Sequence, residues 1–498
     1  MIGKVCIVSR EMEGVAGAGG LKDVVRGLAS ALTEAGADVT VVIPAYGFVA
    51  AGVRLAEFSV TVNGRAVDVA ASVLRIEGIR VVLLDAEAFR WKKAVYTYTA
   101  DDAPEPELVG KGHRDVHEMN VILQAGAVRF LLGDGPPPDV VHGHDGHTGL
   151  LPLYMKKHSG PGEFFERTGI LVTIHNAGEA YQQILGDLEN AVALTGLPAE
   201  DLALGLIDGK INPLLVAGRL ATVNTVSPGY AREMLSRGDG HAGGLGAAYR
   251  AYGVHVKGVI NGIDPGMWGL PRERIGRGRP DKAALRRDFA GLIREGLPSG
   301  LEFIGAPPNP DTPWVLFHNR LTDQKGLEEL IGLPEELRAP ASYAMIVYGQ
   351  GDPEWESALS SRCAGSAHWT FLKGYDPDLT HRLFSAASFV VVPSLWEPCG
   401  QIDMIGQLHG ALPVVRRVGG LRKVRRFIDG FSYSPRSKSG LRRALETALI
   451  LESEAKTWVR MMRRFAENVV YERRSWRKIL VRGYVPLYRK ATRRTRTG

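Results

Sequence analysis

Two cations lie in a short segment of the second half of the chain, directly after a predicted strand. Arg320 and Lys325 precede a helix that carries Leu327 and Leu330. A cation near a helix N-terminus opposes the helix dipole, so neither side chain is a good choice for stabilising this helix. Both suit a bound diphosphate, because charged donors make strong hydrogen bonds with phosphate oxygens. The segment therefore favours an anion site over a purely structural role.

Two further segments end predicted strands in the same half. The first presents a single carboxylate, Glu397, between Trp396 and Pro398. On its own, Glu397 is best interpreted as a cap of the next helix. The second segment is a turn, Gly419-Gly420-Leu421, in which backbone atoms can approach a ligand closely because glycine has no side chain.

The first half opens with a strand and a glycine-rich turn that includes Gly19 and Gly20. Backbone N–H groups and the dipole of the following helix can hold a phosphate at such a turn. Glycine-rich turns serve tight packing between a strand and a helix just as often. The turn alone leaves both interpretations open.

Histidines gather after another predicted strand, at His142, His144 and His147. Their spacing invites a metal site, and two-metal hydrolases use the pattern His-x-His-x-Asp-His. Here Asp145 stands one position early, and such a shift turns a side chain elsewhere in a tight loop, which makes a metal site improbable. The pattern Asp376-Pro377-Asp378 resembles the metal-binding Asp-x-Asp of some transferases, but the proline favours a simple turn.

The elements that must position these residues alternate between short β-branched runs and stretches of helical period. This pattern is typical of parallel sheets covered by helices. Strands are predicted in the first half at residues 5–9, 39–43, 140–142, 170–174, 221–225 and 254–260, and in the second half at 314–318, 344–348, 389–392 and 412–415. Ligands bind outside the carboxyl ends of such strands, where all the segments above fall.

Length and composition fit a soluble protein of two domains. The chain has 498 residues, of which 45% are hydrophobic, and single cores stop growing at roughly 250 to 300 residues. Three widely spaced cysteines offer no disulfide framework, so a reducing cytoplasm is expected. The first apolar run is too short for a signal peptide, and no stretch approaches the ~18 apolar residues of a membrane span.

The formal charge of +7 and a late cluster of arginines would suit a polyanion. A solvated helical face is the favoured interpretation of the cluster, which runs from Arg460 to Arg496. Nucleic-acid bases would need aromatic partners, and Trp476, Tyr484 and Tyr488 are the nearby candidates.

Taken in order, these motifs resemble the glycogen and starch synthases, retaining transferases of glycosyltransferase family 5. The resemblance rests on the order and spacing of Arg320-Leu321-Thr322-x-Gln324-Lys325-Gly326, Glu397-Pro398-Cys399-Gly400 and Val415-Arg416-Arg417-x-Gly419-Gly420-Leu421. It implies the GT-B fold: an α/β protein of two doubly wound, Rossmann-like domains facing across a cleft, with a C-terminal helix that crosses back. The expected domains are residues 1–255, residues 256–474 and a crossover helix with a basic tail, residues 475–498.

The resemblance also implies roles for individual residues. Arg320 and Lys325 would bind the departing diphosphate, Glu397 would lie beside the donor sugar, and His175 and Asp145 would support the reacting glucose. The remaining donor-binding residues would be Gly19, Gly20, Leu21, Asn261, Cys399, Gly400, Gly419, Gly420 and Leu421. Tyr96 and Tyr98 are candidate partners for the base.

Four positions depart from the family pattern. Gly17 and Val216 replace two expected lysines, and Ile402-Asp403 replaces a Thr-Gln pair. The main charged residues remain, so we expect an active enzyme.

The expected reaction transfers glucose from a nucleotide sugar to the non-reducing end of an α-1,4-glucan, with retention of the anomeric configuration. The resemblance implies that the nucleotide sugar is ADP-glucose. No metal or other cofactor, nucleic acid or membrane is expected to take part. One alternative is a related transferase using UDP-glucose or a small acceptor. Another is a metallohydrolase built on His142, His144 and His147, and a third is a polyanion binder.

Overall fold

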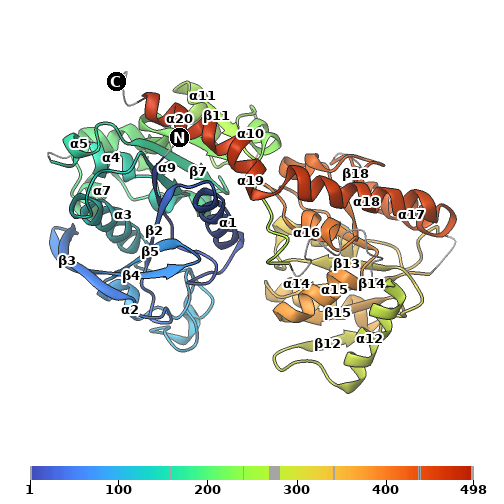
Figure 1. Cartoon of the computed structure of the whole chain (residues 1–498). Helices are drawn as coiled ribbons and strands as arrows, with labels where there is room; N and C mark the ends of the chain where they lie inside the picture. The colour runs from blue at the N-terminus through green and yellow to red at the C-terminus, as the bar shows by residue number, and fades with distance from the viewer. Residues whose placement is uncertain are drawn as a thin grey trace. The chain divides into compact units, whose positions relative to one another are not determined.

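The computed structural model describes residues 3–156, 160–238, 241–268, 281–339, 342–435, 437 and 439–494. The chain divides into two compact units (Figure 1). The first comprises Met1–Gly262 together with Trp476–Gly498, and the second comprises Ile263–Ser475. The first unit extends beyond the expected residues 1–255 because strand β11 (Val256–Gly258) pairs with β10 (Thr222–Thr225) of the first sheet.

The first unit contains a nine-stranded sheet in the order β11-β10-β7-β6-β1-β2-β5-β4-β3. Pairing is parallel from β11 to β5 and antiparallel at β4 and β3. The other strands are β1 (Lys4–Val8), β2 (Asp38–Pro44), β3 (Val53–Val62), β4 (Arg65–Ile76), β5 (Ile79–Asp85), β6 (Val140–His144) and β7 (Gly169–Ile174), and a separate pair is β8 (Leu206–Ile207) with β9 (Lys210–Ile211).

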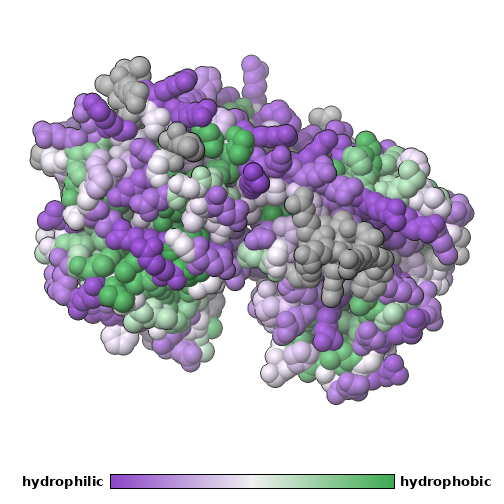
Figure 2. Space-filling view, in the orientation of Figure 1, coloured by the Kyte–Doolittle hydropathy of each residue, from purple (hydrophilic) through white to green (hydrophobic). Residues whose placement is uncertain are grey.

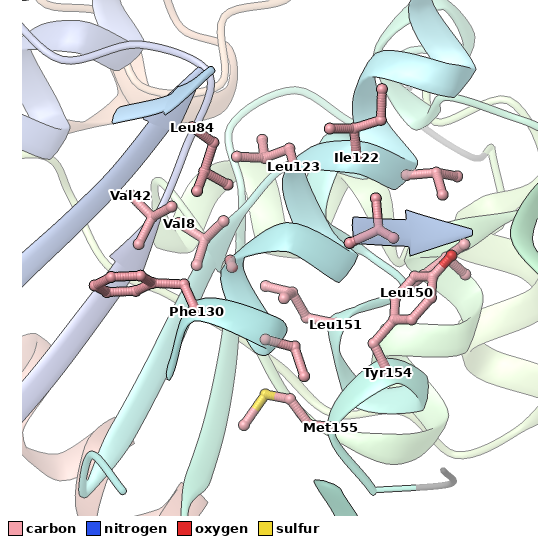
Figure 3. Packing of buried hydrophobic residues seen from close by; sticks show 14 of the residues in the cluster. Val8, Val42, Leu84, Ile122, Leu123, Phe130, Leu150, Leu151, Tyr154 and Met155 are labelled. Carbon is pink, nitrogen blue, oxygen red and sulfur yellow. The ribbon is translucent and has the colours of Figure 1, made fainter. Parts of the chain in front are cut away.

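Helices cover both faces of this sheet. They are α1 (Gly20–Glu34), α2 (Glu87–Arg90), α3 (Val116–Gly133), α4 (Leu151–Lys156), α5 (Pro161–Phe164), α6 (Glu179–Gln182), α7 (Leu188–Thr195), α8 (Ala199–Leu202), α9 (Pro213–Leu220), α10 (Pro228–Met234) and α11 (Leu245–Ala251). Successive residues of a strand point to opposite faces, so each strand serves two cores. On one face Val8 and Val42 lie with Leu123 and Phe130 of α3 and Leu151 of α4 (Figure 3).

The second unit contains a seven-stranded sheet in the order β12-β15-β14-β13-β16-β17-β18. Only β12 pairs antiparallel. Its strands are β12 (Glu302–Gly305), β13 (Trp314–His318), β14 (Ala344–Gly349), β15 (Trp369–Lys373), β16 (Phe389–Val392), β17 (Leu412–Arg416) and β18 (Phe431–Tyr433). Its helices are α12 (Lys282–Glu295), α13 (Leu327–Ile331), α14 (Pro353–Ala364), α15 (Pro377–Ala386), α16 (Ile402–Leu408), α17 (Gly440–Glu454) and α18 (Lys456–Arg473).

The two sheets confirm the predicted α/β class, and every predicted strand is present. The hairpin of β3 and β4 was not predicted, nor were β5, β12, β15 and β18. The hairpin turns at Asn63-Gly64, where both residues have positive φ. An Asn-Gly pair between two extended runs is a strong hairpin signal, and it was available in the sequence.

The C-terminal segment returns to the first unit as α19 (Trp476–Ile479), a π-helical turn (Leu480–Tyr484) and α20 (Val485–Arg494). The aromatic rings of Trp476, Tyr484 and Tyr488 are buried in the core that α1 covers. These rings are therefore not available to stack on nucleic-acid bases, which removes the support for that alternative.

Basic residues of the C-terminal segment, such as Arg489 and Lys490, are exposed on the opposite face. Hydrophilic residues also cover most of the visible face of α18 (Figure 2). Both observations fit the solvated helical face that the sequence favours, although Arg496 lies outside the described residues. Across the described part of the chain, no helix has the length and hydropathy of a membrane span.

The close approach of Trp476 to α1 depends on Gly27. A Cβ atom at Gly27 would overlap with the indole ring. We therefore expect Gly27→Ala to destabilise the first unit by about 1 to 3 kcal/mol, as overpacking does, and to lower the midpoint of thermal unfolding. Gly133→Ala is the matched control, because a Cβ there, at the last residue of α3, meets no atom within 4 Å. An unchanged midpoint for Gly27→Ala would contradict this packing.

Candidate active site

An unpredicted carboxylate occupies the glycine-rich turn after β1. The carboxylate of Glu11 accepts hydrogen bonds from the backbone N–H groups of Ala18 at 2.7 Å and Gly19 at 3.1 Å. The Tyr96 hydroxyl donates to its other oxygen at 2.8 Å. Burial raises the pKa of Glu11. Two of the amides predicted to hold a phosphate are therefore already satisfied, and a phosphate here would use Gly20 or displace Glu11.

The side chain of Lys22 lies over position 17, where the family pattern has a lysine. A Cβ atom at Gly17 would overlap with the aliphatic stem of Lys22. The Lys22 ammonium pairs with Glu13 and lies 3.2 Å from Asp23 Oδ1. The loss of a lysine at position 17 is thus accompanied by a cation from the first turn of α1.

At position 216, the second expected lysine is replaced by an apolar residue. Val216 is fully buried in the core that α3 and α4 cover, where it packs against Gly205. A charged side chain at this place would be costly to bury. Position 216 therefore contributes to packing in this chain.

Asp145 and His175 meet at the ends of the neighbouring strands β6 and β7. The backbone N–H of His175 donates to Asp145 Oδ1 at 2.6 Å. Asp145 has φ of +57°, an uncommon backbone conformation that often accompanies functional sites. The rings of His175 and His144 are joined through Nε2 and Nδ1, which are 2.9 Å apart. The structure therefore brings two of the predicted site residues together.

Burial controls the charge of this pair. It raises the pKa of Asp145 to about 7, against hydrogen bonds from His175 and Asn176 that lower it. It lowers the pKa of His175 to about 3. At neutral pH the imidazole of His175 is therefore uncharged, so it can donate a hydrogen bond to a sugar hydroxyl or accept one from it. The Asp145 carboxyl changes its charge in the same pH range.

The other histidines of this loop have separate partners. His142 uses both ring nitrogens, with the Tyr488 hydroxyl at 3.0 Å and the Thr173 hydroxyl at 2.7 Å. His147 stacks on Tyr96 with 5.6 Å between ring centroids. Among the described residues, no group of three or more His, Cys, Asp or Glu side chains is arranged to hold a metal ion. These contacts argue against the metallohydrolase alternative.

The segment Asp376-Pro377-Asp378 is not the simple turn that the sequence favoured, because Asp376 and Pro377 lie at the start of helix α15. The Asp376 carboxylate accepts from the Leu379 backbone N–H at 2.7 Å and caps α15, with Pro377 at the first helical position.

The two tyrosines proposed as base partners are occupied within the first unit. Tyr98 is buried, and its ring packs edge-on against His113 with centroids 4.9 Å apart. Tyr96 holds Glu11 and His147, as described above. Arg10 also lies over the Tyr96 ring and Lys92 over the Tyr98 ring, so neither ring offers a free face for a base. The sequence could not show this, because it does not reveal which rings pack inside the fold.

In the second unit, Lys325 and Glu397 form an ion pair with 2.8 Å between Nζ and Oε2. Their side chains are 14% and 12% exposed, and the Ser394 hydroxyl also donates to Glu397. The two loops follow the adjacent strands β13 and β16, and a Cβ at Gly326 would overlap with the carbonyl of Pro393. Glu397 does not cap α16, whose N-cap residue is Gln401. The predicted capping role was wrong because the loop turns Glu397 toward Lys325.

Arg320 lies at the start of the same loop as Lys325. Its side chain is exposed and makes no hydrogen bond or ion pair within the ranges that the structure describes. The guanidinium is therefore free to bind an anion.

The glycine turn after β17 packs directly on the Glu397 loop. The Gly420 backbone N–H donates to the Glu397 carbonyl at 2.8 Å, and a Cβ at Gly420 would overlap with the Cys399 carbonyl. Gly419 and Gly400 both have positive φ. The predicted donor-side residues Cys399, Gly400, Gly419, Gly420 and Leu421 are thus in contact with one another.

Asn261 belongs to the first unit, in the segment after β11. It is buried, and its Oδ1 atom has no hydrogen-bond partner among the described residues. Gly20 and Leu21 begin α1 after the Glu11 turn.

Comparison with known proteins matches both halves of the chain. Residues 4–250 match the starch synthase catalytic domain model, and residues 302–467 match glycosyl transferases group 1. The chain is 30% identical to glycogen synthase from Variovorax paradoxus (strain S110), over 98% of this chain and 99% of that protein. It is also 30% identical to glycogen synthase 2 from Geobacter sulfurreducens, with the same coverage.

Solved structures show the same fold. The catalytic domain of starch synthase IV from Arabidopsis thaliana, bound to ADP and acarbose, superposes with a TM-score of 0.77, 22% identity and 99% coverage of both chains. Sucrose-phosphate synthase from Thermosynechococcus elongatus gives a TM-score of 0.57 at 17% identity, with 98% coverage of both chains. These relatives confirm the GT-B class, and the chain belongs to the glycogen and starch synthase family of hexosyltransferases.

Proposed function

We propose that this enzyme transfers glucose from ADP-glucose to the non-reducing end of an α-1,4-glucan, with retention and without a metal ion. The observation that carries the proposal is the ion pair of Lys325 and Glu397, with the free guanidinium of Arg320 on the same loop. The neighbour that was solved with ADP and acarbose supports a nucleoside diphosphate donor and a glucan-like acceptor.

The charges match those that develop in the reaction. Breaking the bond between sugar and phosphate places negative charge on the diphosphate and positive charge on the glucose ring. Arg320 and Lys325 stabilise the first, and the carboxylate of Glu397 stabilises the second. Because both cations belong to the chain, they supply the stabilisation that a divalent ion supplies in other transferases.

The residues of the first unit are assigned to the sugar. The neutral ring of His175 holds a glucose hydroxyl, and its position is fixed by His144 and by the bond from its N–H to Asp145. The carboxylate form of Asp145 accepts hydrogen bonds from sugar hydroxyls and adds to the negative potential around the developing ring charge.

Donor and metal dependence are tested in one assay. Purified enzyme receives a glycogen primer and either ADP-glucose or UDP-glucose in the presence of EDTA, and nucleotide release is measured. We expect turnover with ADP-glucose that EDTA does not reduce. Turnover with UDP-glucose alone would correct the donor, and loss of activity in EDTA that Mg²⁺ restores would contradict the metal-free reaction.

Removal of either cation should slow the reaction strongly. We expect Lys325→Ala and Arg320→Ala to raise the barrier by about 3 to 4 kcal/mol each, which lowers kcat/KM by more than 100-fold. The matched control is Arg294→Ala, an exposed cation on α12 whose guanidinium donates to the Ala290 carbonyl. Near-normal kcat/KM in the first two variants would show that the diphosphate lies elsewhere.

Asp145 gives the reaction a pH dependence. Its pKa is raised to about 7, so the carboxylate form is lost as the pH falls through 7. We expect kcat/KM to fall on the acidic side of pH about 7, and we expect Asp145→Asn to be slow and to lack this limb. The amide oxygen that this substitution introduces can still accept a hydrogen bond from the His175 backbone N–H. Glu11→Gln serves as the control, because the pKa of that buried carboxyl is also raised. This variant should keep the acidic limb if the limb belongs to Asp145. A limb that survives in Asp145→Asn would refute the assignment.

A further inference from the structure

A buried ammonium joins the two loops on the donor side of the second unit. Lys423 lies two residues after the turn Gly419-Gly420-Leu421, and its side chain is 4% exposed. Its Nζ atom donates to the carbonyls of Cys399 at 2.7 Å and Gly400 at 2.8 Å. It also lies 2.9 Å from Oδ2 of Asp403, whose side chain is fully buried.

The contacts of the Lys423 ammonium join two particular segments of the backbone. Cys399 and Gly400 lie two and three residues after Glu397, so a single side chain ties the Glu397 loop to the glycine turn. The Gly420 N–H forms a second tie to the Glu397 carbonyl. Gly400 has φ of +74°, and a Cβ there would lie 3.2 Å from Lys423 Nζ and 3.0 Å from Asp403 Oδ1. The ammonium therefore fills the space beside a backbone turn that leaves no room for a side chain.

Stability alone does not account for such a pair. Taking two charges out of water is costly, and replacing a buried ion pair by apolar residues of similar volume is often neutral or stabilising. Burial raises the pKa of Asp403, and the neighbouring Lys423 opposes that rise. An apolar pair would fill the same volume, but it could not donate hydrogen bonds to two carbonyls.

We propose that Lys423 is a positioning residue, paired with Asp403, that fixes the Glu397 loop against the turn Gly419-Gly420-Leu421 in the geometry that the donor requires. This proposal rests on the proposed function, because it assigns the two loops to the donor diphosphate and sugar. It also gives a physical role to the departure at position 403, where Asp403 replaces the residue usual in the family.

The test removes the ammonium without leaving a buried charge. We expect Lys423→Met/Asp403→Leu to keep the thermal midpoint of the wild type and to lose about 100-fold in kcat, since displacements near 1 Å can cost that much. The KM for glycogen should change less than about twofold, because the acceptor does not contact these loops in the proposal. A second variant, Lys423→Met/Asp403→Asn, removes the ammonium but keeps a polar group at position 403. It replaces the first variant in the test if the first does not fold, and the same loss in kcat is expected.

Two controls separate positioning from packing. Lys423→Gln/Asp403→Asn is neutral but retains a donor for a carbonyl, and it should recover most of the kcat. Arg463→Met/Glu452→Leu removes another ion pair of the second unit, between α17 and α18, and should leave kcat unchanged. A folded Met variant with kcat within about threefold of wild type would overturn the proposal while the function stands. A wild type that turns over neither ADP-glucose nor UDP-glucose would overturn both.

Discussion

The ion pair between Lys325 and Glu397 is the interaction on which the proposed donor site of this enzyme depends. It joins two loops that are 72 residues apart in sequence. In water such a pair contributes little, but both side chains here are mostly buried, and their attraction is correspondingly stronger. Each charge stabilises the other in this ion pair. In the proposed reaction, Lys325 interacts with the negative diphosphate and Glu397 with the positive glucose ring.

Sheet topology brings these residues together. β13 and β16 are neighbours in a parallel sheet, so the loops at their carboxyl ends lie side by side. The same rule acts in the first unit, where β6 and β7 place Asp145 beside His175. The parallel order of the strands, set by the helices that cross between them, thus determines which loop residues meet.

The sequence predicted much of this arrangement, because buried parallel strands are recognisable as apolar runs and functional residues follow them directly. It did not predict the β3–β4 hairpin, although Asn63-Gly64 was a usable signal, or the short strands β12, β15 and β18. Glu11 was missed because only the folded turn shows that its carboxylate reaches the amides of Ala18 and Gly19. The substitution at Asp403 was visible, but its partner Lys423 follows from tertiary contact and not from spacing.

We propose that two cations of the second unit, Arg320 and Lys325, hold the diphosphate, and this assignment can be measured. Calorimetric titration with ADP and AMP in EDTA tests it most directly, because the two ligands differ only in the second phosphate. We expect the wild type to bind ADP at least about tenfold more tightly than AMP, a difference of about 1.4 kcal/mol. We expect this difference to disappear in Arg320→Ala/Lys325→Ala. An undiminished preference for ADP in that variant would show that these cations do not hold the diphosphate.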